Sequence, residues 1–280
     1  MQELHFELSY LTLRGLAIGS PQKPMILALH GWLDNAASFL PLSEYLDDFY
    51  IVALDVTGHG NSDHRAPGNH YHLMDFVHDI HELVETQGWQ PFILLGHSMG
   101  GIIATLYASC FNDKVNKLIS IESFGPMTKD AASSPAQLRE SIESRIKANR
   151  SKARHPSSLD HTIDARAKAG EMSKASASLL VARNVEQIDG QYYFKTDRKL
   201  RTFSSLRITE EQAEAFLRNI ACPMLVVHGD KGFESMRAAF SHRKSWVSQL
   251  RSVECSGHHH VHMDNPQPVA TAIREFLNAD

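Results

Sequence analysis

The chain has 280 residues, of which 42% are hydrophobic and 21% are charged, and this is enough apolar material for a large buried core and too little charge for a disordered chain. The net charge of −4 gives no reason to expect nucleic acid or an anionic membrane as a partner. No stretch approaches the roughly 18 consecutive apolar residues of a membrane-spanning helix, so we expect none.

Short apolar runs alternate with helical patterns over the first 124 residues. The runs predict buried strands at residues 5–10, 11–18, 25–29, 50–54, 92–95 and 118–121. Two helices are predicted between strands, at residues 74–86 and 101–110, and Gly88 ends the first of them. Buried strands separated by helices are typical of a parallel sheet with crossover helices, so the predicted fold class is α/β.

Residues 125–219 differ in character from the rest of the chain. They are polar, helical in pattern and rich in serine, alanine, lysine and arginine. A connection this long is not an ordinary loop, so we expect an inserted cap of several helices. The strand pattern resumes at residues 224–228 and 253–256, and a closing helix is predicted at 269–277. The predicted division is therefore a core, residues 1–124 and 220–280, and a cap.

Residues 96–100, Gly-His-Ser-Met-Gly, match the pattern G-x-S-x-G. They follow a predicted strand and precede a predicted helix, which is the context that this motif requires. The glycines make room around a strained turn that exposes the Ser98 hydroxyl, and the pattern therefore predicts Ser98 as a nucleophile. The backbone N–H of the next residue, Met99, is the first expected donor of an oxyanion hole.

A serine nucleophile needs a base, and the stretch 256–266, SGHHHVHMDNP, offers several histidines after the last strand. With both motifs in this order the chain resembles the α/β-hydrolase family, in which the catalytic histidine lies seven residues before a proline. Counting back from Pro266, the resemblance implies His259, with His258 and His260 as the nearest competitors. A metal site is an alternative interpretation of the cluster, but neighbouring histidines on one loop point in different directions, and we predict no metal.

The acid of the triad is left open between two residues. The family usually has it three residues after a glycine that follows residues 224–228, but that position is Gly232. Asp230 is close to it. A minority of the family, including many haloalkane dehalogenases, takes the acid from the end of the preceding strand, which corresponds to Glu122. A carboxylate within an apolar run needs a partner such as an imidazole N–H, so we favour Glu122 over Asp230.

Further motifs extend the resemblance. The family takes its second oxyanion-hole donor from the residue after a His-Gly pair, which here is Trp32. Residues 55–62 match the architectural pattern D-x-x-G-H-G-x-S. The stretch 30–39, HGWLDNAASF, and the cap stretch 190–200, GQYYFKTDRKL, are similar to the serine-hydrolase-like branch of the family. The resemblance implies a mostly parallel eight-stranded sheet with flanking helices and an inserted helical cap.

The chemistry that these residues favour is hydrolysis of a carboxylic ester, or a related acyl bond, through an acyl-enzyme on Ser98. Haloalkane dehalogenases and epoxide hydrolases of this fold carry aspartate at that position and are disfavoured. A carbon–carbon bond hydrolase, a perhydrolase and a ligand-sensing protein with little turnover remain alternatives. We expect a small-molecule ester as partner and no cofactor. Three widely spaced cysteines without a CxxC pair favour a cytoplasmic location.

Overall fold

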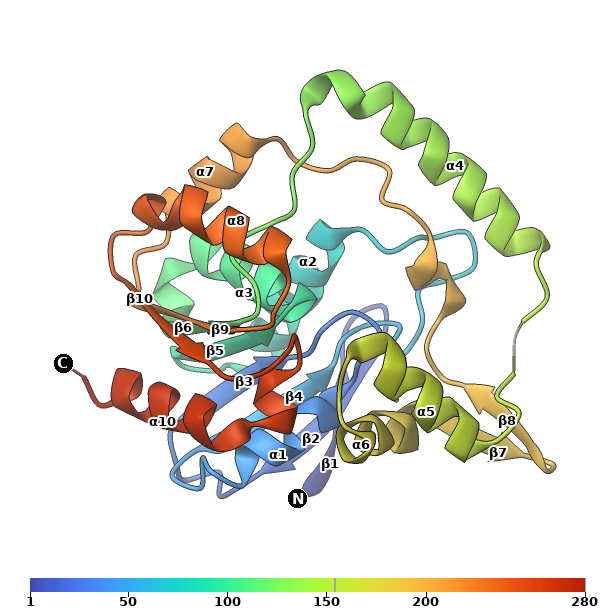
Figure 1. The fold of residues 1–280 in the computed structure, drawn as a ribbon, viewed down its shortest axis with the longest axis horizontal. Helices are drawn as coiled ribbons and strands as arrows, with labels where there is room; N and C mark the ends of the chain where they lie inside the picture. Colours follow the sequence, from blue (N-terminus) through green and yellow to red (C-terminus); the bar gives the residue numbers. More distant parts are fainter. Residues whose placement is uncertain (154, 280) are drawn as a thin grey trace.

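One eight-stranded sheet organises the molecule. The computed structural model describes residues 1–153 and 155–279 (Figure 1). The strand order is β1-β2-β4-β3-β5-β6-β9-β10, in which β2 is antiparallel to both of its neighbours, β1 and β4, and all other neighbouring pairs are parallel. The predicted α/β fold with a mostly parallel eight-stranded sheet is confirmed. The strands are β1 Gln2–Glu7, β2 Thr12–Ile18, β3 Met25–Leu29, β4 Tyr50–Asp55, β5 Phe92–His97, β6 Val115–Ile121, β9 Met224–Gly229 and β10 Leu250–Cys255.

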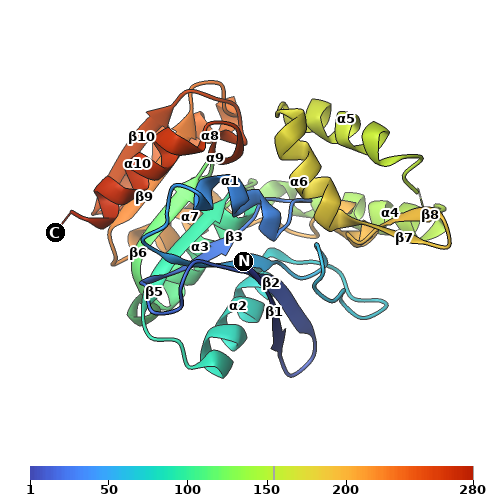
Figure 2. The same cartoon turned by 90° about the horizontal axis from the view of Figure 1, so that it is seen from below.

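Helices cover both faces of the sheet. One apolar cluster joins α2, α3 and α7 to one face, and a second joins the region of α1 and helices α9 and α10 to the other (Figure 2). Because both faces are covered, the central strands are mostly apolar, and residues 26–29 of β3 are fully buried. These helices are α1 Leu40–Ser43, α2 Leu73–Gln87, α3 Met99–Cys110, α7 Glu210–Arg218, α8 Glu234–Arg243, α9 Val261–Asp264 and α10 Pro266–Leu277.

The sequence pattern predicts only helices in the segment 125–219, but the segment also contains two strands. It contains the antiparallel hairpin β7 Val185–Ile188 and β8 Gln191–Phe194 besides its helices. The Asp-Gly pair at the hairpin turn has positive φ at both residues, and this turn signal was missed. The other helices of the segment are α4 Ser134–Arg150, α5 Leu159–Gly170 and α6 Lys174–Asn184. Helices α4 and α5 lie away from the sheet in both views, whereas α6 lies beside the edge that carries β1 (Figures 1 and 2).

The end of this segment belongs to the packing of the sheet. Helix α7 packs against α3, and Leu217 of α7 is fully buried in the cluster that covers the sheet. The exact extent of a separate cap, predicted as 125–219, therefore stays a proposal. Helix α8 was not predicted, and α10 begins three residues earlier than expected because Pro266 suits the first turn of a helix.

A buried ion pair joins the segment 125–219 to the sheet. Asp55, at the end of β4, accepts hydrogen bonds at 2.9 Å on both carboxylate oxygens from Nε of Arg183 in α6. The same guanidinium also pairs with Glu3 of β1 at 2.7 Å. Asp55 is fully buried and also accepts the backbone N–H groups of Ala36 and Asn61. One carboxylate thus connects two loops at the edge of the sheet with helix α6.

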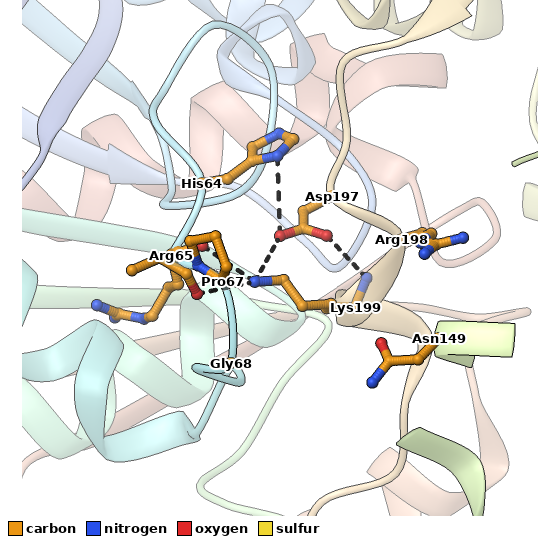
Figure 3. Close-up of a pocket in the computed structure, with 9 residues that line it drawn as sticks. His64, Arg65, Pro67, Gly68, Asn149, Asp197, Arg198 and Lys199 are labelled. Atoms are coloured by element: carbon orange, nitrogen blue, oxygen red, sulfur yellow. Dashed lines mark hydrogen bonds and ion pairs between the residues drawn. The ribbon is translucent and has the colours of Figure 1, made fainter. Parts of the chain in front are cut away.

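A second junction lies near residues 190–200. Asp197 accepts a hydrogen bond of 2.8 Å from the Tyr71 hydroxyl, and its own N–H donates to the carbonyl of Gly58. Lys199 donates to three backbone carbonyls of residues 65–69 (Figure 3). A cavity of about 520 Å³ lies at this junction, and none of the candidate catalytic residues lines it. The stretch 190–200 therefore joins the segment 125–219 to the loop after β4.

The length and apolar character of a helix decide whether it can cross a membrane. In the part of the chain that the structure describes, no helix combines the length and apolar character needed to cross a bilayer.

We predict that Arg183→Met lowers the free energy of unfolding by about 3–5 kcal/mol, because it leaves the buried Asp55 carboxylate without its cation. Urea denaturation followed by circular dichroism measures this loss. The control is Arg139→Met, which removes an exposed pair with Glu143 on α4 and should leave the unfolding midpoint unchanged. An equal change in the free energy of unfolding in both variants would show that the Asp55–Arg183 pair stabilises the protein no more than an exposed ion pair does.

Candidate active site

Ser98 lies on a strained turn between β5 and α3. Its backbone has φ 51° and ψ −115°, a conformation that residues with a Cβ rarely adopt. A Cβ on Gly100 would lie 2.0 Å from the carbonyl oxygen of Leu29, and one on Gly96 would lie 2.3 Å from that of Gly100. Only glycines fit around this turn, and Ser98 itself stays partly accessible at the carboxyl edge of the sheet.

The ring of His259 bridges a hydroxyl and a carboxylate. Its Nε2 lies 2.9 Å from Oγ of Ser98, and its Nδ1 lies 2.9 Å from Oε2 of Glu122. The carbonyl of His259 accepts a hydrogen bond of 2.9 Å from Nε2 of His97, and Phe233 stacks on the ring at a centroid distance of 4.0 Å. Backbone and ring are therefore both held, with the two ring nitrogens directed at Ser98 and Glu122.

Glu122 closes β6 and is 2% exposed. Its backbone is left-handed, with φ 53°, and its N–H donates to the carbonyl of Val227 at 2.8 Å. Its carboxylate serves two partners, because Oε1 accepts the N–H of Gly229 at 2.7 Å while Oε2 faces His259. A buried carboxylate with both oxygens occupied can hold an imidazole in one tautomer.

The usual acid position is empty because Glu122 fills its space. A Cβ on Gly232 would lie 2.3 Å from Oε1 and 2.4 Å from Oε2 of Glu122. Asp230, the other candidate, is exposed and turned elsewhere. Its carboxylate accepts the N–H of Gly257 at 2.8 Å, so it supports the loop before His259 without touching the ring.

The two backbone N–H groups expected to form an oxyanion hole belong to Trp32 and Met99. Met99 begins α3, where N–H groups lack helical acceptors, and Trp32 follows the His-Gly pair after β3. Neither N–H donates to another residue within 1–153 or 155–279. Both are thus free to bind an oxygen that carries developing charge.

The competing histidines do not reach Ser98. The His258 side chain is 43% exposed, and its Nδ1 lies 3.9 Å from a carboxylate oxygen of Glu171. Nε2 of His260 lies 3.2 Å from Oδ2 of Asp34. His262 is fully buried, and burial together with neighbouring His260 lowers its pKa to about 3. It is therefore neutral and packs as a core residue.

Asp34, His97 and His260 form the one group within the described residues whose ligand atoms come close enough to hold a metal, within 4.8 Å of one another. A cation is already present, because the guanidinium of Arg166 from α5 pairs with the other oxygen of Asp34. Burial alone would raise the pKa of Asp34, but its contacts with His260 and Arg166 hold that pKa well below its usual range. This arrangement favours a second cap-to-core ion pair over a metal centre.

Several of these residues were missed at the level of sequence. Asp34 and His97 lie within recognised motifs, yet nothing in the motifs marks them as partners of the His259 loop. Arg166 lies in a polar helical stretch without any motif, and Phe233 is a single apolar residue in a turn. Only the folded chain brings them together.

Comparison with known proteins gives consistent relatives. A family model described as alpha/beta hydrolase fold matches residues 24–266. The chain is 30% identical to a "Serine hydrolase-like protein" of Danio rerio, over 95% of this chain and 85% of the relative, and 30% identical to "Serine hydrolase-like protein 2" of Homo sapiens, over 99% and 94%. The crystal structure of a hypothetical protein from Pseudomonas aeruginosa PAO1 is 33% identical, with a TM-score of 0.92 and full coverage of both chains.

We predict that Gly232→Ala slows the labelling of Ser98 by a fluorophosphonate by up to about 10⁴-fold, because the new Cβ displaces the Glu122 carboxylate from His259. The rate of labelling is measured by quenching the reaction at a series of times and reading the fluorescence of the labelled protein on a gel. Asp230→Asn is the matched control in the same turn, since asparagine can still accept the N–H of Gly257, and it should label at the original rate. Normal labelling of Gly232→Ala would separate Glu122 from the reactivity of Ser98.

Proposed function

Because the chain belongs to the α/β-hydrolase fold family, in its serine-hydrolase-like branch, we propose that it hydrolyses carboxylic esters or related acyl compounds through an acyl-enzyme on Ser98. The observation that carries this proposal is the ring of His259, which lies 2.9 Å from both the Ser98 hydroxyl and the Glu122 carboxylate. A base that contacts the nucleophile on one side and an orienting acid on the other is the arrangement that acyl transfer requires.

In the first half of the reaction, Oγ of Ser98 attacks the acyl carbonyl carbon while Nε2 of His259 takes the hydroxyl proton. Glu122 accepts the Nδ1–H hydrogen bond throughout and stabilises the imidazolium. The N–H groups of Trp32 and Met99 bind the oxyanion of the tetrahedral intermediate. The bond to the leaving alcohol then breaks, and His259 gives that oxygen the proton it took from Ser98.

In the second half, a water molecule attacks the acyl-enzyme. Nε2 of His259 removes a proton from the water, and the same oxyanion hole stabilises the second tetrahedral intermediate. The bond to Oγ of Ser98 breaks as the proton returns to it, which releases the carboxylic acid and restores the free enzyme.

We assign substrate selection to the cap, residues 125–219, over a core of 1–124 and 220–280. Three contacts support this assignment, because each ties the cap to a loop beside Ser98. Arg166 pairs with Asp34, and Nδ2 of Asn35 donates to the carbonyl of Leu180 at 2.9 Å. Nε1 of Trp32 donates to the carbonyl of Leu200 at 3.0 Å. A cap held against these loops limits what can approach the nucleophile.

The alternatives differ from ester hydrolysis in measurable ways. A carbon–carbon bond hydrolase would label at Ser98 but leave simple esters intact, whereas a ligand sensor would bind without labelling. The cytoplasmic location and the small-molecule ester as partner stay proposals of the same kind.

We predict that Ser98→Ala lowers kcat/KM on p-nitrophenyl esters, tested from acetate to palmitate, by at least about 10⁴-fold, because only the oxyanion hole and substrate binding remain. Glu122→Gln should lose activity to a similar extent, whereas Asp230→Asn should retain it. Circular dichroism checks that all three variants are folded. Full activity of a folded Ser98→Ala variant would remove the acyl-enzyme, and loss in Asp230→Asn with activity kept in Glu122→Gln would reassign the acid.

A further inference from the structure

An arginine of the cap lies over the tryptophan that supplies the expected oxyanion-hole N–H. Arg201 ends the 3-10 helix Arg198–Arg201, and its guanidinium carbon is 5.9 Å from the centre of the Trp32 ring. Trp32 is 49% exposed, and its Nε1–H is bound to the carbonyl of Leu200, the residue before Arg201. The Trp32 indole therefore contacts the backbone next to Arg201, and its ring lies under the Arg201 guanidinium.

Arg201 differs from the other arginines that join the cap to the core. Arg166 pairs with Asp34, and Arg183 pairs with Asp55 and Glu3. Arg201 has no carboxylate within 4.0 Å and donates no hydrogen bond to any residue within the described ranges. A guanidinium offers five N–H donors and stays charged at neutral pH, so these donors are available to a ligand.

A second arginine lies near Arg201. Arg201 is exposed at the surface, and partial burial of its guanidinium, followed by the nearby guanidinium of Arg166, lowers its pKa, yet an arginine with a lowered pKa is still a cation at neutral pH. The carboxylates on this side are engaged elsewhere, because Asp34 contacts both Arg166 and His260, and Glu122 faces His259. An anion that enters beside Trp32 therefore meets an uncompensated cation.

We propose that the preferred substrates of this hydrolase carry an anionic group, such as a carboxylate, which pairs with Arg201 while the scissile carbonyl lies at Ser98. This inference rests on the proposed function and names its substrate class. In this arrangement the Trp32 backbone N–H binds the carbonyl oxygen, and the Trp32 ring lies under the guanidinium that binds the anion. Trp32 therefore contacts both recognition points. The anionic group can lie on either the acyl or the alcohol part of the ester.

Matched substrate pairs test the proposal. On the acyl side, mono-p-nitrophenyl adipate is compared with p-nitrophenyl hexanoate, and on the alcohol side 4-acetoxybenzoate is compared with its methyl ester. Arg201→Gln should lower kcat/KM for the preferred anionic member by about 10- to 100-fold, the value of a charge-assisted hydrogen bond, and leave its neutral partner unchanged. Arg201→Lys should restore part of the loss. The pair that responds identifies the side that carries the anion.

The control variant is Arg198→Gln in the same 3-10 helix, whose guanidinium donates to the carbonyl of Ser151. It removes the same charge from a guanidinium that already has a backbone partner, and it should leave the anionic preference intact. Equal losses in Arg198→Gln and Arg201→Gln would reduce the effect to long-range electrostatics and overturn the proposal. No preference for either anionic ester in the unchanged protein would also overturn it.

A binding measurement separates this inference from the proposed function. Calorimetry with the Ser98→Ala variant should show tighter binding of the anionic ester than of its neutral partner, and a further Arg201→Gln change should abolish the difference. If esters are not hydrolysed but this difference is present, the proposed reaction fails and anion recognition stands. If neutral esters are hydrolysed and Arg201→Gln changes neither binding nor kcat/KM, only the inference about Arg201 fails.

Discussion

The buried carboxylate of Asp55 holds the sheet, two of its loops and helix α6 in one arrangement. It fixes the loop after β3 through the N–H of Ala36, the loop after β4 through the N–H of Asn61, and helix α6 through Arg183. An ionised group without water around it is tolerated only when its oxygens are fully engaged, so these partners cannot shift independently. The position of the loop that carries Trp32 therefore depends on this carboxylate.

Strain at the carboxyl edge of the sheet is concentrated where the chemistry is expected. Ser98 and Glu122 follow adjacent parallel strands, and both have positive φ, at a cost of about 1–3 kcal/mol each. Hydrogen bonds of regular strand length hold each of them in place, from Ser98 to the carbonyl of Ile121 and from Glu122 to that of Val227. The hydrogen bonds between neighbouring strands therefore continue through both strained residues, and these buried bonds offset the cost of the strained backbone.

Local patterns predicted the sheet and the turn at Ser98, because buried strands and a glycine-flanked serine leave strong signals within a few residues. The choice between Glu122 and Asp230 was harder, since it depends on the space beside Gly232, which a sequence does not display. Hairpin β7–β8 and helix α8 were missed for a related reason. Their residues are mostly exposed, so their apolar periodicity is weak and tertiary packing decides their conformation.

The contact between Gly232 and Glu122 limits how a chain of this fold can change over evolutionary time. Two positions can supply the carboxylate, but a side chain at 232 and a glutamate at 122 occupy the same volume. A lineage that exchanges one site for the other cannot first gain the new acid and later discard the old one. It must cross an intermediate in which His259 lacks a properly seated partner, so the two substitutions are epistatic, and reversal is as difficult as the original exchange.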